Sequence, residues 1–142
     1  MTGKGENHGW RGSGRFRVAR LDGRLVLSFG AISTKRTRLN AEIGAFFRKD
    51  YRALRPAYGG FRVTIYVECE NPHRRIDADN VAKACLDALT GIVWHDDSQV
   101  QHLAVDKVAA ERDRVTVVVE PAGKTDAAAE LRTLTNALEG LP

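Results

Sequence analysis

The sequence has two cysteines, no apolar run long enough to cross a membrane and no internal repeat. Cys69 lies in a strand-like segment and Cys85 in a helix-like one, and two cysteines are too few for a disulfide framework. Their placement is typical of buried, reduced thiols. Every apolar run is shorter than the roughly 18 to 20 residues of a membrane span, and the first ten residues lack the apolar core of a signal peptide. These absences predict a cytoplasmic protein.

Several common functional motifs are also missing. There is no P-loop, no G-x-G-x-x-G after a strand and no Ser/His/Asp order of a hydrolase triad. The spacings of His73, His95 and His102 relative to the two cysteines match no closed zinc pattern. The sequence therefore argues against a P-loop or dinucleotide-binding protein, a serine hydrolase and a structural zinc site.

The composition is that of one folded domain with an uneven charge distribution. The chain has 142 residues, of which 43% are apolar and 28% charged, which fits a single globular domain. Residues 1–75 hold 16 Lys and Arg against 6 Asp and Glu, whereas residues 76–142 hold 6 against 12. This asymmetry predicts a basic surface that attracts a polyanion and carboxylates gathered for a local purpose, unless the charges simply cover the surface.

Patterning divides the chain into three parts. Residues 1–22 begin with a glycine-rich stretch and read as a flexible basic arm, residues 23–121 as the main domain, and residues 122–142 as a C-terminal amphipathic helix. That last helix carries an apolar stripe that we expect to pack on its own sheet, or alternatively to form a subunit contact. The stripe consists of Ala127, Leu131, Leu134 and Leu138.

Within the main domain the pattern alternates between strands and helices. We expect a strand over residues 23–32, a basic helix from Ser33 or Thr34 to before Pro56, and an alternating strand over 61–70. A helix from about Asn80 to Leu89 follows, and then two strands over 99–110 and 114–121 that the short charged turn between them joins as a hairpin. The predicted fold class is α+β (mixed α/β), a single small domain with helices packed on one mixed β-sheet.

The stretch RRIDADN combines two aspartates with the start of a helix. If the backbone is extended there, Asp77 and Asp79 project on the same side, and Lys83 follows Asp79 by one helical turn. Asp and Asn are also ordinary residues of turns and helix caps, and Lys83 could merely pair with Asp79 or Asp87. A site and a simple helix cap both remain open at this point.

A second acidic pair, in WHDDSQV, follows that helix after a short turn. We expect the turn to bring Asp96 and Asp97 back toward the helix start, beside Asp77 and Asp79. Several carboxylates in one place repel one another unless a cation is bound. Oxygen ligands of this kind suit Mg²⁺, with Mn²⁺ as a substitute. The pattern therefore predicts a divalent metal site.

The run RIDADNVAKACLDALTGIVWHDDSQV resembles the central motif of the RusA family of endodeoxyribonucleases, the Holliday junction resolvases. The shared features are D-x-D-N, a lysine four residues beyond the second aspartate, a helix ending in D-A-L, and a later D-D-[SA]-Q-[VI]. The order of the surrounding elements agrees more loosely. The glycine-rich start, MTGKGENHGWRGSGR, departs from the strand and basic, proline-containing loop with which the family usually begins.

The resemblance implies specific roles for residues of this chain. Asp77, Asp79 and Asp97 match the catalytic carboxylates, Lys83 matches the catalytic lysine, and Asp96 is a further candidate metal ligand. The implied enzyme is a small homodimer that uses Mg²⁺. Its substrate is four-way or otherwise branched DNA, which it nicks on two opposing strands in recombination and repair.

The basic half of the chain supplies candidate DNA contacts. Two arginines stand directly before the acidic motif and three basic residues crowd the first turn of the preceding helix, where they can meet phosphates or remain solvated. These residues are Arg74, Arg75, Lys35, Arg36 and Arg38. Trp94 and Phe47 fit the core better than a wedge at the junction. The alternative functions are a noncatalytic junction-binding module and a nuclease that prefers flaps or forks.

Overall fold

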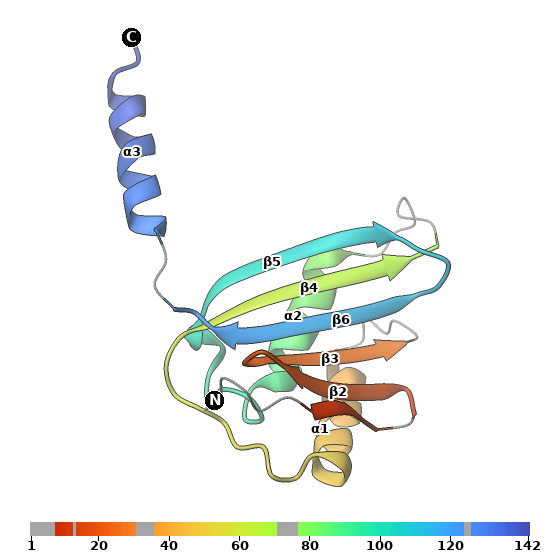
Figure 1. Ribbon diagram of the computed structural model, residues 1–142. Coiled ribbons are helices and arrows are strands. Elements are labelled where there is room, and N and C mark those ends of the chain that lie inside the picture. The colour runs from red at the N-terminus through yellow and green to blue at the C-terminus, as the bar shows by residue number, and fades with distance from the viewer. Residues whose placement is uncertain (1–7, 13, 31–35, 71–76, 124–125) are drawn as a thin grey trace.

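The protein is built on one mixed β-sheet with two helices on one face. The structure is a computed structural model that describes residues 8–12, 14–30, 36–70, 77–123 and 126–142. In this part of the chain six strands form a sheet in the order β1-β2-β3-β6-β4-β5 (Figure 1). The predicted α+β class is thereby confirmed. The elements are β1 (His8–Arg11), β2 (Phe16–Leu21), β3 (Arg24–Gly30), α1 (Arg36–Asp50), β4 (Phe61–Cys69), α2 (Ala78–Leu89), the short 3₁₀ helix η1 (Asp97–Gln99), β5 (Val100–Ala109), β6 (Arg114–Pro121) and α3 (Ala127–Glu139).

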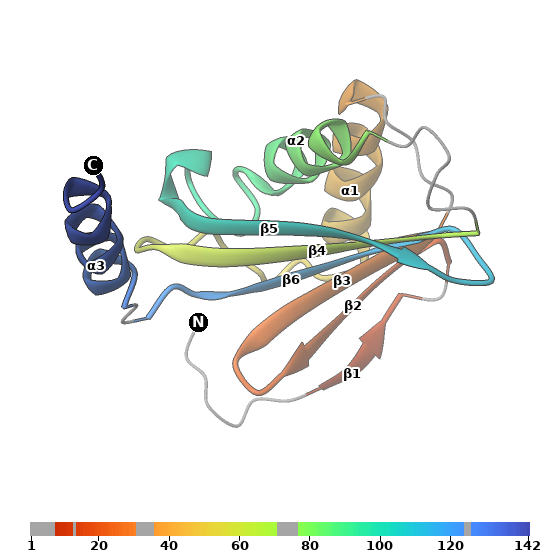
Figure 2. The same ribbon diagram turned by 90° about the horizontal axis from the view of Figure 1, so that it is seen from above.

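The core lies between the sheet and the helices α1 and α2, which cover the same face (Figure 2). In β4 every second residue is buried from Phe61 to Cys69, as its alternating sequence predicts. Helix α1 contributes the expected apolar stripe, in which Leu39, Ile43 and Phe47 are buried. Trp94 is fully buried against Phe61. Phe47 and Trp94 are therefore core residues.

Two strands lie in the segment that we expected to be a flexible arm. β2 pairs antiparallel with β3 in continuous register from Phe16 to Leu21, and β1 pairs with β2. Asp22 and Gly23, which join β2 to β3, both have positive φ values of 52° and 79°. A two-residue turn of this kind suits the twist of a β-hairpin, and Asp-Gly is a favoured sequence for it. The arm prediction is thus wrong for residues 8–11 and 16–21.

The two strands that follow α2 do not form the expected hairpin. β5 pairs in parallel with β4, whereas β6 inserts between β3 and β4 and pairs antiparallel with both. The cause is burial: Val115, Val117 and Val119 of β6 reach the core, while β5 is largely exposed at the sheet edge. β4, α2 and β5 therefore form a βαβ crossover.

Helix α3 confirms the predicted C-terminal helix but not its packing. None of its residues is buried, and Leu131, Leu134 and Leu138 are exposed. Figure 1 shows α3 standing beyond the end of β6, away from the sheet. The expectation that its stripe packs on the sheet of the same chain is therefore wrong. No described helix is long and apolar enough to cross a membrane.

Both cysteines are free and buried, as expected. Cys85 lies on the inner face of α2, where burial raises the pKa of its thiol to about 12. The thiol is therefore protonated at neutral pH and has little nucleophilic character.

Candidate active site

The first acidic pair lies at the N-terminal end of α2. Asp77 is the N-cap residue, with extended backbone (φ −77°, ψ 106°), and its carboxylate oxygen accepts a hydrogen bond of 3.0 Å from the backbone N–H of Asp79. The helix thus begins two residues earlier than predicted. Both carboxylates are exposed, and the positive end of the helix dipole favours their negative charge. Asp77 caps the helix and still presents its second oxygen to solvent.

Lys83 projects from the outer face of α2. Val81, Ala84 and Cys85 on the opposite face are buried and fix the helix on the sheet, whereas Lys83 is exposed. In the described part of the chain no ion pair joins Lys83 to Asp79 or Asp87. A cation one turn from Asp79 that forms no such pair is available to an anionic ligand.

A compact turn leads from the end of α2 to the second acidic pair. Gly91, with φ of 86°, allows a tight turn in which its N–H donates to the carbonyl of Trp94 at 2.7 Å. The buried Trp94 ring donates from Nε1 to Oγ1 of Thr90 at 3.0 Å. The backbone of Ala57, just before β4, bridges to Trp94. The chain after α2 is therefore anchored to the start of β4.

Gln99 ties this segment together with four hydrogen bonds. Its Oε1 accepts from the backbone N–H groups of His95 at 2.8 Å and Asp96 at 3.1 Å. Its Nε2 donates to the carbonyls of Ala57 and Gly59, each at 2.9 Å. Together with the Asp96 carboxylate, which accepts from the N–H of Ser98, this makes a capping box around η1. The Gln of the D-D-S-Q motif is thus a structural brace.

The two adjacent aspartates differ in their surroundings. Hydrogen bonds from the Ser98 side chain and backbone lower the pKa of Asp96, so this carboxylate is committed to the cap. Asp97 is exposed at the start of η1, and within the described residues its side chain has no hydrogen-bond or ion-pair partner. Of the two, Asp97 is the one whose oxygens are available to a ligand.

Within one chain the two acidic pairs lie at opposite ends of α2. The helix has 12 residues and is therefore about 18 Å long. Because β4 and β5 are parallel, the crossover helix returns the chain along the full strand, so that the two ends of α2 lie toward opposite ends of the sheet (Figure 2). Among the described residues no group of three or more His, Cys, Asp or Glu side chains is placed to hold a metal ion. The expectation that WHDDSQV returns to the helix start is wrong.

The predicted DNA contacts are only partly described. Arg38 is exposed and forms an ion pair with Glu42 at 3.7 Å. Arg36 is the first residue of α1, and its side chain lies outside the described part. Lys35, Arg74 and Arg75, and likewise His73, also lie outside the described residues.

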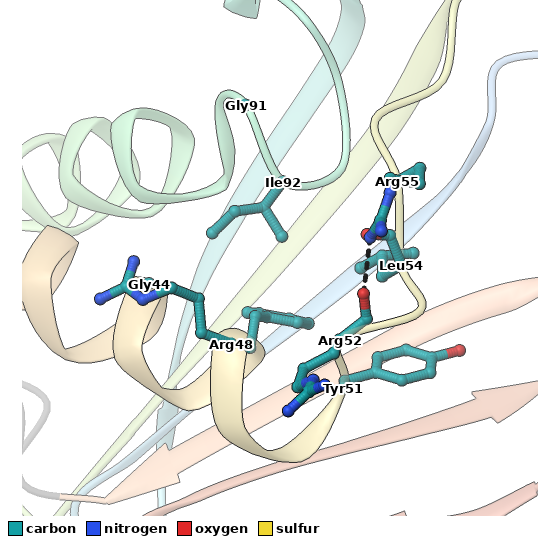
Figure 3. A pocket seen from close by; sticks show the side chains of 9 residues that line it. Gly44, Arg48, Tyr51, Arg52, Leu54, Arg55, Gly91 and Ile92 are labelled. Atoms are coloured by element: carbon teal, nitrogen blue, oxygen red, sulfur yellow. Dashed lines mark hydrogen bonds between the residues drawn. The ribbon is translucent and has the colours of Figure 1, made fainter.

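A basic pocket between α1 and the turn after α2 was not predicted. It has a volume of about 520 Å³, and Arg48, Arg52 and Arg55 contribute to its wall (Figure 3). The turn residues Gly91 and Ile92 line its other side. The sequence signal was present, since these arginines recur at spacings of four and three after an apolar stripe that buries the other face of α1.

Comparison with known proteins identifies the family. The family model for endodeoxyribonuclease RusA matches residues 12–120 of this chain. The protein therefore belongs to the RusA endodeoxyribonuclease family, a family of Holliday junction resolvases that act on branched DNA and generally depend on a divalent metal. No curated protein matches the sequence significantly.

Proposed function

We propose that this protein is a Mg²⁺-dependent endonuclease that resolves Holliday junctions by paired nicks and acts as a homodimer. Family membership gives the nuclease class. The observation that carries the assignment is that Asp79, Lys83 and Asp97 are all exposed at α2 and η1, with no described ion pair that would explain them structurally. Unneutralised charges at matching motif positions are expected of a site that receives metal and phosphate.

The carboxylates fit Mg²⁺ in chemistry but not within a single chain. Carboxylate oxygens are the ligands that Mg²⁺ prefers, and Asp77 and Asp79 lie at one end of α2 while Asp97 lies beyond the other. A divalent ion held by all three would offset phosphate charge and make a bound water more acidic. Within the described residues, one protomer offers a pair of aspartates at each end of α2.

A two-fold dimer would bring the two pairs together. β5 is an edge strand in the described sheet, and it exposes Leu103 and Val108. An unpaired edge of ten residues is a ready surface for a second copy. Antiparallel pairing of two β5 strands would place Asp97 of one protomer on the side where the partner's α2 begins. Such a dimer would hold two sites related by symmetry, as paired nicks require.

Ala104 lies near the middle of β5, and its small side chain allows two β5 strands to pair around it. If the two-fold axis passes through Ala104, its side chain meets its own copy, Leu103 faces Val105 of the partner, and Asp106 faces the partner's His102. Directly opposite residues in an antiparallel pair share one face of the sheet, so this register keeps apolar and polar contacts separate.

Lys83 would supply positive charge to the scissile phosphate. It projects from the outer face of α2 one turn from Asp79, and an ammonium there would stabilise the negative charge that builds on the phosphate in the transition state. Arg38, Arg74, Arg75, Lys35 and Arg36 would contact the phosphates of the junction arms, with an affinity that falls steeply as salt rises.

A cleavage assay tests the proposed function. Labelled four-way junction and plain duplex are incubated with the wild-type protein in Mg²⁺ or in EDTA, alongside Asp79→Asn. We expect paired nicks in the junction that require Mg²⁺ and are absent from the variant. Junction binding without any cleavage would instead identify a noncatalytic binding module. Faster cutting of flaps or forks in the same gel would correct the substrate.

Dimer geometry has a readout that does not depend on activity. Asn80→Cys and Ser98→Cys place thiols beside Asp79 and Asp97, while both native cysteines are buried. When the two single variants are mixed and treated with a short thiol crosslinker, we expect a covalent dimer. A link that forms only within the doubly substituted chain would contradict the two-chain site.

A further inference from the structure

An exposed aromatic stack lies next to Asp97 and has no part in the core. The side chain of Tyr58 is 83% exposed, although large aromatic side chains are usually well buried. Its ring stacks on that of His95, with centroids 4.0 Å apart and planes 25° from parallel. One face of Tyr58 therefore rests on His95, and the high exposure leaves the other face in solvent.

The backbone on both sides of this stack is held in place. Ala57 donates its N–H to the carbonyl of Val93 at 2.9 Å, and the Gln99 amide donates to the carbonyls that flank Tyr58. The same Gln99 side chain accepts from the N–H of His95. Because one residue fixes both segments, the two rings are presented in one arrangement before any ligand binds. Preorganisation of this kind reduces the entropy lost on binding.

The basic pocket is lined in part by residues of the same two chain segments. Arg55 in its wall is three residues before Tyr58, and Ile92 on its other side is three residues before His95. No carboxylate is among the described residues that line the pocket, and the rest of that lining is apolar or aromatic. Figure 3 shows Arg48 on α1 and Arg52 just after the end of α1, with Arg55 bonded to the carbonyl of Arg52. Guanidinium groups without a nearby carboxylate are suited to phosphate.

We propose that the Tyr58–His95 stack and the arginine pocket together bind one nucleotide of the DNA strand that passes Asp97, an inference that rests on the proposed nuclease function. The base of an unpaired nucleotide stacks on the open face of Tyr58, and its own or the neighbouring phosphate enters the pocket. A base inside a duplex has both faces covered, whereas a base splayed at a branch point has one free. The site therefore favours branched or single-stranded DNA over plain duplex.

The experiment measures binding without cleavage. In the Asp79→Asn background, with EDTA present, a four-way junction with 2-aminopurine at the branch point is titrated with protein. Tyr58→Ala removes the platform, Tyr58→Phe retains it, and Tyr66→Ala changes an exposed tyrosine on β4, away from this site. Arg52→Gln removes one pocket cation. Because the Tyr58 side chain is so exposed, its loss should leave the circular dichroism spectrum and thermal midpoint unchanged.

We expect Tyr58→Ala to raise Kd about tenfold, as the loss of one stacked base predicts, and to abolish the change in 2-aminopurine fluorescence. Tyr58→Phe and Tyr66→Ala should both remain within about twofold of the parent, and Arg52→Gln should weaken binding and lower its salt dependence. Parent-like binding and fluorescence in Tyr58→Ala would overturn the proposal even if the wild-type protein cleaves junctions. If wild type does not cleave but Tyr58→Ala loses the signal, the nuclease function fails and the nucleotide site stands.

Discussion

The two ends of α2 carry acidic pairs of similar sequence but opposite construction. At the N-terminal end, a single described side-chain hydrogen bond, from Asp79 N–H to Asp77, holds the motif. At the C-terminal end, Trp94, Asp96 and Gln99 lock the loop to the start of β4. The motif that is continuous in sequence is thus divided in space by a helix. The pair after α2 is held in place by side-chain hydrogen bonds. The pair at the start of α2 has exposed carboxylates that we propose to meet the other pair across a dimer.

The largest expected effect separates the two neighbouring aspartates at the braced end. Asp97→Asn should reduce junction cleavage by on the order of a thousandfold, because it removes the charge of a side chain that we propose as a metal ligand. Asp96→Asn should keep most of the activity, since asparagine also caps helices. Single-turnover nicking in Mg²⁺ measures both. Equal losses in the two variants would show that Asp96 is a ligand rather than a cap.

Lys83 tests the unbraced end. Lys83→Ala should lower the single-turnover nicking rate by about a hundredfold, because it removes the ammonium group that we propose to lie beside the scissile phosphate. Its free energy of unfolding should change little, since the side chain is exposed and alanine favours helix. Lys83→Arg is the matched control that keeps the charge. A loss of stability with normal cleavage would assign Lys83 to an ion pair.

Removing the Gln99 side chain should leave the loop after α2 as weakly held by side-chain hydrogen bonds as the start of α2. Gln99→Ala breaks four hydrogen bonds, and we expect a loss of about 1–3 kcal/mol in the free energy of unfolding, together with slower cleavage. Gln99→Glu keeps the acceptor oxygen but not the donors to Ala57 and Gly59, so it should lose part of that stability. Urea denaturation gives the values. Unchanged stability in both variants would remove the basis for calling Gln99 a brace.

The smallest expected effect is a pH dependence of stability that comes from Cys85, which is buried in α2 between the two acidic pairs. Burial raises the pKa of Cys85 in the folded state to about 12, so the thiol ionises first in the unfolded state. The stability tied to the neutral thiol is complete below the unfolded pKa of about 8.5 to 9 and declines as pH rises from there toward 12. Relative to Cys85→Ala, the wild-type protein should lose about 1.4–2 kcal/mol between pH 7 and pH 10. A parallel pH dependence in both proteins would contradict a buried thiol.

Local patterns in the sequence predicted most elements of the fold. Alternation identified β4, and apolar spacing identified α1, α2 and α3. β2 was missed because the glycine-rich start masked it, although the Asp22-Gly23 pair between two apolar runs is a hairpin signal. Strand pairing was missed because nearness in sequence favoured a β5–β6 hairpin, whereas burial of the valines of β6 decides its central position.

Local spacing predicted where the candidate residues lie on α2, but not how the two acidic pairs are arranged; their roles remain predictions. Asp77, Asp79 and Lys83 share the start of α2 as their spacing indicates. The position of Asp97 depends on β5 being parallel to β4, which no local pattern reveals. The proposed nucleotide site of Tyr58 and His95 depends on a contact between segments 37 residues apart. Both features depend on contacts between residues far apart in the sequence, which local sequence patterns do not reveal.

We propose that the two acidic pairs meet between protomers, and mixing inactive variants tests this arrangement most directly. Asp79→Asn and Asp97→Asn proteins are combined, allowed to exchange subunits, and assayed for single nicks in a four-way junction. If the site is shared, each mixed dimer holds one intact site, and nicking should recover to about a quarter of the wild-type rate. Mixing Asp77→Asn with Asp79→Asn, whose changes lie in the same half, should recover none. Absence of recovery in the first mixture as well, with subunit exchange demonstrated, would contradict the account.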